Sequence, residues 1–261
     1  RCSFCCINAP FDSNRYRRRS PDAVAAEIVY LRDVHGVRTF KIIDEMFVLN
    51  DTHVEAICDR LIAAGGDFNI WAYARIDTAK SGQLDKLHRA GVRWLALGIE
   101  SGSAHVRDGA QKALKSADIE GVVRMIQGAG INVIGNYIFG LPDDDPTSVQ
   151  ETLDLALELN CEFANFYAAM AYPGSQLYTM AVRGGWDLPE GWGGYSQHSF
   201  ETLPLKTEAM SSADVLRFRD RAFQDYFSSP SYLGMVSEKF GAATVAEIET
   251  MRQVPLARRL F

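Results

Sequence analysis

The sequence predicts an α/β protein in which parallel strands and helices alternate as in a barrel, followed by a C-terminal helical region. Three observations predict this fold class. A unit of amphipathic helix, short break and apolar strand recurs along the 261 residues. Glycine stands at the end of most of these helices, and polar residues follow several of the strands. Such alternation is typical of parallel strands joined by right-handed crossovers.

The repeated unit predicts five helix–strand pairs. Helices are expected to begin near Pro21, Asp51 and Pro146, and two more are expected to end near Gly91 and Gly130. Glycine suits a helix end because it readily takes the left-handed conformation that closes the last turn. Asp145 is the predicted N-cap of the fifth helix. The expected strands are residues 39–43, 68–73, 94–99, 133–138 and 163–168.

Polar residues at the strand ends favour a barrel over an open doubly wound sheet. The open sheet would prefer a glycine-rich phosphate turn after its first strand, and the sequence contains no G-x-G-x-x-G. A barrel instead places functional residues at the C-terminal ends of several strands. The chain has such residues after three expected strands: Asp44 and Glu45, Arg75 and Asp77, Glu100 and Ser101.

The repeat ends near Arg183 and a different pattern follows. A loop rich in glycine and aromatic residues precedes expected helices at residues 211–227, 230–240 and 243–259. Ser211 with Asp214 forms a variant of the capping box at the start of the first of these helices. We therefore expect a core domain at residues 1–182 and a C-terminal loop and helical region at residues 183–261.

The charge of the chain excludes some classes of partner. A net charge of -6 argues against an extended phosphate-binding face, although arginines gather at residues 15–19. No apolar run approaches the roughly 20 residues that cross a bilayer, and no signal segment opens the sequence. The sequence thus predicts a cytoplasmic protein with neither a nucleic-acid partner nor a membrane span.

Three of the five cysteines crowd at the start of the chain, at Cys2, Cys5 and Cys6. An odd number of cysteines does not suit a disulfide framework, and in a reducing compartment such a cluster more often binds metal. A single C-x-x-C can be a zinc half-site, a redox pair or part of an iron-sulfur site. The barrel pattern contradicts a thioredoxin-like redox pair, so the residues alone leave an iron-sulfur cluster, a zinc site and structural cysteines open. Cys58 and Cys161 lie in apolar stretches and are expected to be buried.

The motifs follow one another in a specific order: C-x-aromatic-C, a helix, a strand followed by paired acids, and a later strand ending in G-I-E-S-G. This order resembles the radical S-adenosylmethionine (SAM) superfamily, which implies a partial (β/α)6 barrel of the TIM type. In that family three cysteines at C-x-x-x-C-x-x-C hold a 4Fe-4S cluster. Cys2 and Cys5 resemble the second and third of them. The resemblance thus implies that the first cysteine and the first strand lie upstream of Arg1.

The resemblance also implies which residues bind the amino acid part of SAM. Asp44 and Glu45 stand where the family places its motif for the SAM amino group, with acids in place of the usual glycines. A carboxylate beside an ammonium forms a charge-assisted hydrogen bond, which gives this assignment a physical reason. Both acids could instead favour a helix N-terminus. Arg75 could pair with the SAM carboxylate or simply with Asp77.

Further positions resemble the family's contacts to the adenosine part of SAM. Phe4 resembles the aromatic residue that packs at the adenine, and Glu100 with Ser101 resembles the ribose motif. A solvated acid at a strand end is the alternative for Glu100. Ile138 and Gly140 belong to a segment that resembles the adenine-contacting G-x-I-x-G-x-x-E. In that segment, Asn136 replaces the first glycine and Asp143 the glutamate.

Residues 172–178 resemble the P-G-[ST]-x-L-Y element of the cobalamin-binding branch of the family. Membership of that branch implies cobalamin bound by a domain upstream of this chain. It also implies that SAM is cleaved reductively to a 5′-deoxyadenosyl radical, for methylation or ring formation on an unreactive carbon. The expected partners are a small-molecule substrate and an electron donor such as flavodoxin or ferredoxin.

Two other functions compete with this interpretation. One is an α/β barrel that binds zinc or another ligand without radical chemistry. The other is a divalent-metal hydrolase that uses Asp44, Glu45 and Glu100. A cysteine four residues before Cys2 in the upstream sequence would separate the radical enzyme from both.

Overall fold

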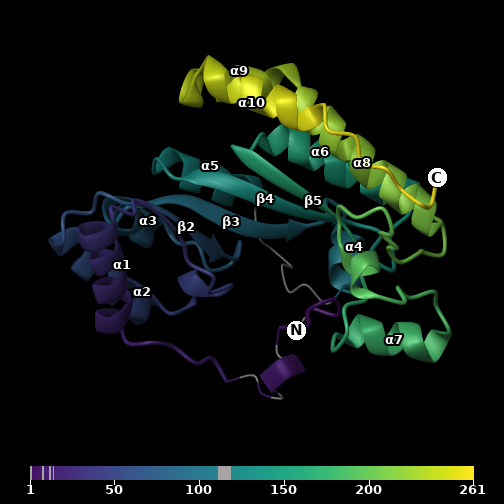
Figure 1. The fold of residues 1–261 in the computed structure, drawn as a ribbon, viewed down its shortest axis with the longest axis horizontal. Helices are drawn as coiled ribbons and strands as arrows, with labels where there is room; N and C mark the ends of the chain where they lie inside the picture. The colour runs from purple at the N-terminus through teal and green to yellow at the C-terminus, as the bar shows by residue number, and fades with distance from the viewer. Residues whose placement is uncertain (1, 8, 12, 14, 111–118) are drawn as a thin grey trace. The chain divides into compact units, whose positions relative to one another are not determined.

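The computed structural model describes residues 2–7, 9–11, 13, 15–110 and 119–261. Five strands in this part of the chain form one sheet in the order β1-β2-β3-β4-β5 (Figure 1). They are β1 (Thr39–Lys41), β2 (Asn69–Ala74), β3 (Val92–Glu100), β4 (Asn132–Phe139) and β5 (Phe163–Ala168).

The strand order separates the two architectures that the sequence left in competition. β1 and β2 pair in parallel with Phe40 opposite Ile70, and β2 and β3 pair in parallel with Ala72 opposite Leu95. Each strand lies beside the next one in the chain, so the sheet has no topological switch point of the doubly wound kind. The predicted α/β class with the strand order of a partial barrel is confirmed.

The chain divides into two compact units, here named unit 1 and unit 2. Unit 1 comprises Arg1–Asn14, Glu100–Lys115 and Asn136–Phe261, and unit 2 comprises Arg15–Ile99 and Ser116–Gly135. Unit 1 includes residues on both sides of position 183. The predicted boundary between core and C-terminal region therefore stays a prediction.

The helices of unit 2 are α1 (Pro21–His35), α2 (Asp51–Ala63), α3 (Ser81–Arg89) and α5 (Ile119–Gly128). Ser20 caps α1 by accepting a hydrogen bond from the Ala23 N–H, and Gly36 ends the helix with φ 68°. A residue with a Cβ would be strained in that left-handed conformation. α1 packs on α2, α2 on α3, and α3 on α5. The predicted glycine-ended helices of this unit are thus confirmed.

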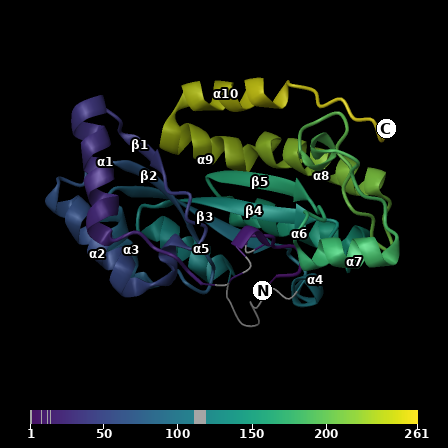
Figure 2. The ribbon, with the colours of Figure 1, turned by 60° about the horizontal axis from the view of Figure 1, so that its bottom comes forward.

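The helices of unit 1 are α4 (Ala104–Gly109), α6 (Pro146–Leu159), α7 (Gln176–Gly184), α8 (Ser212–Ser228), α9 (Pro230–Phe240) and α10 (Ala242–Arg252). The predicted N-cap Asp145 and the predicted capping box of Ser211 with Asp214 are both present, and Asp145 also forms a capping box with Ser148. α8 packs on β5 and α6, and α10 packs on α8 and α9 (Figure 2). Short 3-10 helices are Ala9–Phe11, Phe47–Leu49 and Trp192–Tyr195.

Aromatic side chains fill the core between β4, β5 and α8. The Phe139 and Phe166 rings stack with centroids 5.8 Å apart, and the Phe166 ring meets the Tyr226 ring edge-on at 5.5 Å. The buried Tyr226 hydroxyl donates a hydrogen bond to the Cys161 carbonyl oxygen at 2.6 Å. These contacts hold one face of β4 and β5 against α8. Because successive side chains of a strand point to opposite faces, the alternate residues of both strands lie on the other face of the sheet.

Two elements end earlier than predicted. β1 ends at Lys41 rather than residue 43, and Ile43 is 83% exposed. The reason is a turn, in which the Phe47 N–H bonds back to the Asp44 carbonyl oxygen. α10 ends at Arg252 rather than residue 259, because Pro255 restricts the residue before it and cannot continue a helix.

Candidate functional site

Cys2 and Cys5 lie on a tight turn in unit 1. The Cys5 N–H donates to the Cys2 carbonyl oxygen at 3.2 Å, an i to i+3 pattern that keeps the two Cα atoms within about 7 Å. Two more backbone bonds hold the turn from either side: Ser3 N–H to Ala110 O at 3.1 Å, and Leu177 N–H to Ser3 O at 2.8 Å. Cys2 is half-buried and Cys5 is exposed. The turn thus brings the backbones of the two cysteines close together and holds them in place.

The remaining cysteines differ in their surroundings. Cys58 and Cys161 are buried, as predicted, and burial raises the pKa of the Cys58 thiol to about 12. Cys6 is half-buried. Within the described ranges, no three His, Cys, Asp or Glu side chains gather to form a metal site. The turn therefore offers two thiols of the three that the predicted cluster needs.

Phe4, inside the same turn, is the first predicted adenine contact. Its ring packs against a buried apolar cluster formed by Val106, Ala110, Leu141 and Ala169. Ile138 of β4, a second predicted adenine contact, packs against the same cluster. The structure therefore brings these two predicted residues onto one apolar surface beside the cysteine turn. Their contact with adenine stays a prediction.

Residues 172–178 pack onto the chain that follows the cysteines. Gly174 has φ 89°, and a Cβ added to it would lie 2.3 Å from the Cβ of Ala9. Ser175 caps α7 by accepting the Tyr178 N–H at 3.0 Å, and the N–H of Leu177 bonds to Ser3 as described above. This segment thus holds the cysteine turn in place.

The loop after β3 is strained and tightly packed. Glu100 has φ 69°, a conformation uncommon for a residue with a side chain, and it is 9% exposed. The fully buried Ser101 hydroxyl pairs with the Thr152 hydroxyl at 3.1 Å, and the Gly102 N–H donates to the same Thr152 oxygen at 2.9 Å. A Cβ on Gly102 would lie 2.5 Å from the Glu151 carbonyl oxygen. α6 thus fixes this loop.

Arg107 holds the same loop from another side. Its Nη1 donates to the carbonyl oxygens of Ser101 at 2.6 Å and of Gly102 at 2.9 Å, and burial lowers the pKa of its guanidinium. The Ser101 hydroxyl also accepts the Ser103 N–H at 3.1 Å, so protein groups use two of its three hydrogen-bonding positions. The contacts of Glu100 and Ser101 with a ribose stay predictions.

A buried carboxylate organises the loop after β4. Gly140 has φ 85°, and a Cβ there would lie 2.5 Å from a methyl of Val215. The N–H groups of Gly140 and Leu141 both donate to Asp144 Oδ2 at 2.9 Å, and the Ser148 hydroxyl donates to Asp144 Oδ1 at 2.6 Å. Burial raises the pKa of Asp144, and these three hydrogen bonds oppose the rise. Gly140 thus serves a tight backbone turn.

In unit 2, Asp44 and Glu45 have different surroundings. Asp44 accepts the Tyr16 hydroxyl at Oδ2 and the Met46 N–H at Oδ1, the latter at 2.9 Å. Burial and the Asp44 carboxylate raise the pKa of Tyr16 well above its ordinary value. Glu45 is exposed at the surface, yet partial loss of water and the nearby Asp44 raise its pKa. Asp44 is therefore held by protein groups, whereas Glu45 is the more accessible of the two carboxylates.

Arg75 pairs with Asp77, which was the alternative to a contact with the SAM carboxylate. Its Nε lies 2.8 Å from Asp77 Oδ1 and its Nη2 lies 2.9 Å from Asp77 Oδ2, a two-pronged ion pair. Both side chains are partly exposed. An interaction with the SAM carboxylate would compete with this pair and stays a prediction.

Lys41 of β1 makes cation–π contacts with two aromatic rings of β2 in unit 2. Lys41 Nζ is 4.0 Å from the centre of the Trp71 ring and 5.6 Å from that of Tyr73. Trp71 and Tyr73 share one face of β2 because side chains alternate along a strand. The Trp71 Nε1 is buried without a hydrogen-bond partner among the described residues. This alternation was visible in the sequence, but these residues were not among the predicted site residues.

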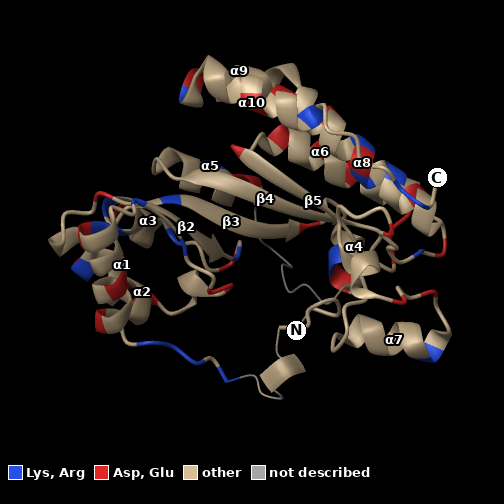
Figure 3. Cartoon of the chain, in the orientation of Figure 1, with Lys and Arg blue, Asp and Glu red and all other residues tan. Residues whose placement is uncertain are grey.

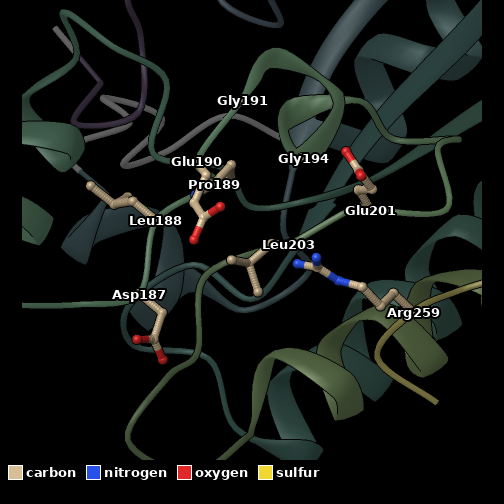
Figure 4. Close-up of a pocket in the computed structure, with 9 residues that line it drawn as sticks. All are labelled: Asp187, Leu188, Pro189, Glu190, Gly191, Gly194, Glu201, Leu203 and Arg259. Atoms are coloured by element: carbon tan, nitrogen blue, oxygen red, sulfur yellow. The ribbon is translucent and has the colours of Figure 1, made fainter.

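A cavity of about 330 Å³ lies in the C-terminal part of unit 1 (Figure 4). Its lining combines three acids and one arginine with apolar residues such as Leu188 and Leu203. None of the predicted SAM or cluster residues is among its lining residues. The lining residues are Asp187, Leu188, Pro189, Glu190, Gly191, Gly194, Glu201, Leu203 and Arg259.

The predicted site residues are shared between the two units. Those in unit 1 are Cys2, Phe4, Cys5, Glu100, Ser101, Ile138 and Gly140, and those in unit 2 are Asp44, Glu45 and Arg75. The structure adds residues that sequence reasoning missed: Tyr16, Arg107, Asp144 and Thr152. The use of both sets in one cofactor site stays a prediction.

Comparison with known proteins identifies the family. The model of the radical SAM superfamily matches residues 1–156, and the chain belongs to this superfamily. An uncharacterised methyltransferase of Pyrococcus horikoshii is 24% identical over 232 residues, which are 89% of this chain and 50% of that protein. The anaerobic magnesium-protoporphyrin IX monomethyl ester cyclase of Cereibacter sphaeroides is 27% identical over 205 residues, 77% of this chain and 33% of the cyclase.

A solved structure shows the same fold at lower identity. It is the radical SAM methyltransferase TsrM from Kitasatospora setae with cobalamin and a [4Fe-4S] cluster bound. The TM-score is 0.63 at 20% identity, over 84% of this chain and 44% of TsrM. The chain spans half or less of the length of each of these three proteins. Among the described residues, no helix has the length and apolar character needed to cross a membrane.

Proposed function

We propose that this chain is the core of an enzyme that cleaves SAM reductively at a 4Fe-4S cluster. When bound, the cluster supplies one electron to the sulfonium of SAM, which yields methionine and a 5′-deoxyadenosyl radical that takes a hydrogen atom from the substrate. Family membership supports this function. The single structural observation that carries it is the turn at residues 2–5, on which two thiols are fixed by three backbone hydrogen bonds.

Cys2 and Cys5 would hold two irons of the cluster as thiolates, which are the usual protein ligands of such clusters. Their arrangement fits this task, because a turn with an i to i+3 bond brings the two Cα atoms within about 7 Å and the flanking bonds keep the turn in place. The third thiolate would come from a cysteine upstream. The protein thereby positions the cofactors and excludes competing reactions, whereas the cofactors supply the chemistry.

The chain's own residues would then bind SAM part by part. Phe4 and Ile138 offer the apolar surface for the adenine, since both pack on one buried cluster. Glu100 would accept hydrogen bonds from the ribose hydroxyls. Glu45 would receive the SAM ammonium, because an accessible carboxylate forms a charge-assisted hydrogen bond with it. Arg75 would leave Asp77 to meet the SAM carboxylate.

We further propose cobalamin-dependent methylation or ring formation on an unreactive carbon of a small-molecule substrate. The relatives include a methyltransferase and a cyclase, and the structure of similar fold holds cobalamin. Residues 172–178, which resemble the cobalamin-binding branch, pack against the turn that bears the thiols. Cobalamin would be bound by a domain upstream of this chain, and an electron donor such as flavodoxin or ferredoxin would reduce the cluster.

The test is an anaerobic assay of the complete gene product. The protein is reconstituted with iron and sulfide, given SAM and a reductant, and 5′-deoxyadenosine is measured by mass spectrometry. Cys5→Ala should lose the cluster and the product, whereas Cys6→Ala should keep both, since Cys6 is not a predicted ligand. A protein with a verified cluster that forms no 5′-deoxyadenosine contradicts the proposal. So does a Cys5→Ala variant with unchanged iron content.

A further inference from the structure

Three hydrogen-bond donors lie side by side on one face of β1 and β2 in unit 2. Lys41 of β1 is paired with Trp71 of β2, and Tyr73 lies two residues further along β2. Because paired residues of neighbouring strands share a face and side chains alternate along a strand, all three point to the same side of the sheet. The other face of β2 is closed, since Ile70 and Ala72 are fully buried there. We name Lys41, Trp71 and Tyr73 the donor cluster.

Ring contacts and the strand ladder hold the donor cluster together. Lys41 Nζ lies 4.0 Å from the centre of the Trp71 ring and 5.6 Å from that of Tyr73, and the two ring centres are 5.8 Å apart. The Ile42 N–H donates to the Trp71 carbonyl oxygen at 2.9 Å, so main-chain pairing fixes the end of β1 beside Trp71. The three donors are therefore close enough together to meet one small chemical group.

The donor cluster lacks acceptors among the residues that the structure describes. The Trp71 Nε1 is buried there without a hydrogen-bond partner. Within the same ranges, the Lys41 ammonium contacts the two rings but forms no ion pair, and the Tyr73 hydroxyl forms no hydrogen bond. Buried donors in folded proteins are nearly always paired, so an unpaired one beside two further donors points to an acceptor supplied by a ligand.

The charge of the donor cluster favours an anion as this ligand. Neither β1 nor β2 contains an acid, and Figure 3 shows acids of unit 2 on α1 and α2. Asp44, which follows β1, already accepts hydrogen bonds from Tyr16 and Met46. Lys41 is exposed and its side chain is flexible, so its ammonium can turn from the rings to an anion. An ammonium with two neutral donors would bind a carboxylate or a phosphate through charge-assisted hydrogen bonds.

We propose that the donor cluster binds an oxyanion, the carboxylate or phosphate group of the small-molecule substrate. This inference rests on the proposed function, in which Glu45 and Arg75 meet the amino acid part of SAM. Lys41 precedes Glu45 by four residues and Tyr73 precedes Arg75 by two, so the cluster lies on the strands that lead to those two side chains. Two residues of a strand span about 7 Å. The cluster would thus hold the substrate next to the amino acid end of SAM.

The test follows the Trp71 indole N–H by nuclear magnetic resonance in the complete, reconstituted gene product, isotope-labelled in its tryptophan side chains. Trp71→Phe identifies this signal, because it removes it. Acetate and phosphate are the probes, and acetamide is the neutral counterpart of acetate. The Trp71 signal should move and reach saturation with at least one of the two anions. It should stay in place with acetamide, which lacks the charge that the Lys41 ammonium recognises.

Variants separate this site from a general effect of charge. Lys41→Met should weaken the binding of the anion at least about 10-fold, because it removes a charge-assisted hydrogen bond. Lys41→Arg keeps the positive charge and should retain most of the binding. The matched control is Lys80→Met, which removes the same charge at another exposed lysine of unit 2 and should bind the anion as wild type does.

A second titration, with SAM present at saturation, separates the substrate from SAM as the source of the anion. The shift should persist, because the two ligands occupy neighbouring sites. Displacement of the anion by SAM would assign the cluster to the SAM carboxylate and overturn the proposal. So would a Trp71 signal that neither anion moves, or equal binding by Lys41→Met and Lys80→Met. Anion binding in a protein that forms no 5′-deoxyadenosine would reject the proposed function and the substrate role with it, whereas 5′-deoxyadenosine without anion binding rejects the donor cluster alone.

Discussion

Replacing Gly102 by alanine tests how the loop after β3 is built. A methyl group at this position would lie 2.5 Å from the Glu151 carbonyl oxygen, 2.7 Å from its carbonyl carbon and 2.9 Å from the Thr152 Cα. All three atoms belong to the backbone of α6, so no side chain can rotate away. Contacts of this kind are essentially never shorter than 3.0 Å. The loop and the helix must therefore separate by about 0.5 Å or more, the difference between 3.0 and 2.5 Å.

Such overpacking costs about 1–3 kcal/mol of the free energy of unfolding. The separation also strains the hydrogen bonds from Ser101 and Gly102 to Thr152, which supports the upper half of that range. Because Glu100 precedes this loop directly, SAM affinity should fall as well. Urea denaturation measures the first effect, and calorimetric titration of SAM into the complete, reconstituted gene product measures the second.

Gly234→Ala is the matched control for this prediction. Gly234 lies within α9, and a Cβ there would meet nothing within 4 Å, so alanine should stabilise the helix by about 0.5–1 kcal/mol. A Gly102→Ala variant that is as stable as wild type and binds SAM equally well would show that α6 does not confine this loop. A change of stability in the same direction in both alanine variants would show the same.

Three further predictions concern buried polar groups. Thr152→Val should cost about 1–3 kcal/mol in urea denaturation, because it removes a buried hydroxyl bound to three groups, whereas Thr147→Val at an exposed position should be nearly neutral. Asp144 has a raised pKa, so the folded state binds more protons than the unfolded state and stability should fall as pH rises above the ordinary value of 3.8. Asp144→Asn should remove that fall, and an unchanged pH profile would contradict it. Arg258→Met should cost about 3 kcal/mol by leaving its partner carboxylate with fewer bonds, whereas the neighbouring, exposed Arg259→Met should cost under about 0.5 kcal/mol.

The order of the elements could be predicted because it follows from local patterns. β5 has the predicted bounds, and the predicted N-caps of α6 and α8 are present, because apolar alternation and capping side chains act over a few residues. The short helix α4 and the early end of β1 could not be predicted in this way. β1 is followed by a turn in which the Phe47 N–H bonds to the Asp44 carbonyl oxygen, and α4 is followed by a long-range bond from the Ser3 N–H to the Ala110 carbonyl oxygen.

The residues that hold the candidate site were harder to find than the candidates themselves. Comparison of motifs drew attention to Asp143, yet Asp144 is the carboxylate that binds the backbone of the loop after β4. Thr152 and Arg107 fix the loop at Glu100 from positions with no motif of their own. Their roles depend on which elements pack together, and a sequence pattern gives no measure of those distances.

The cysteine turn shows the opposite case, in which a motif and its support were both visible in the sequence. Cys2 and Cys5 stood out by spacing, and residues 172–178 stood out by resemblance. The structure joins them, because Leu177 donates a hydrogen bond to Ser3 within the turn. This contact could not be predicted from the sequence, because Ser3 and Leu177 lie far apart along the chain.

We propose that the turn at residues 2–5 helps to hold a cluster to which SAM binds. The direct measurement is electron paramagnetic resonance of the complete gene product, reconstituted and reduced without oxygen, before and after SAM is added. We expect a signal of a reduced 4Fe-4S cluster that changes on addition of SAM and is absent in Cys5→Ala. A signal that SAM leaves unchanged, or one that persists in Cys5→Ala, would contradict it.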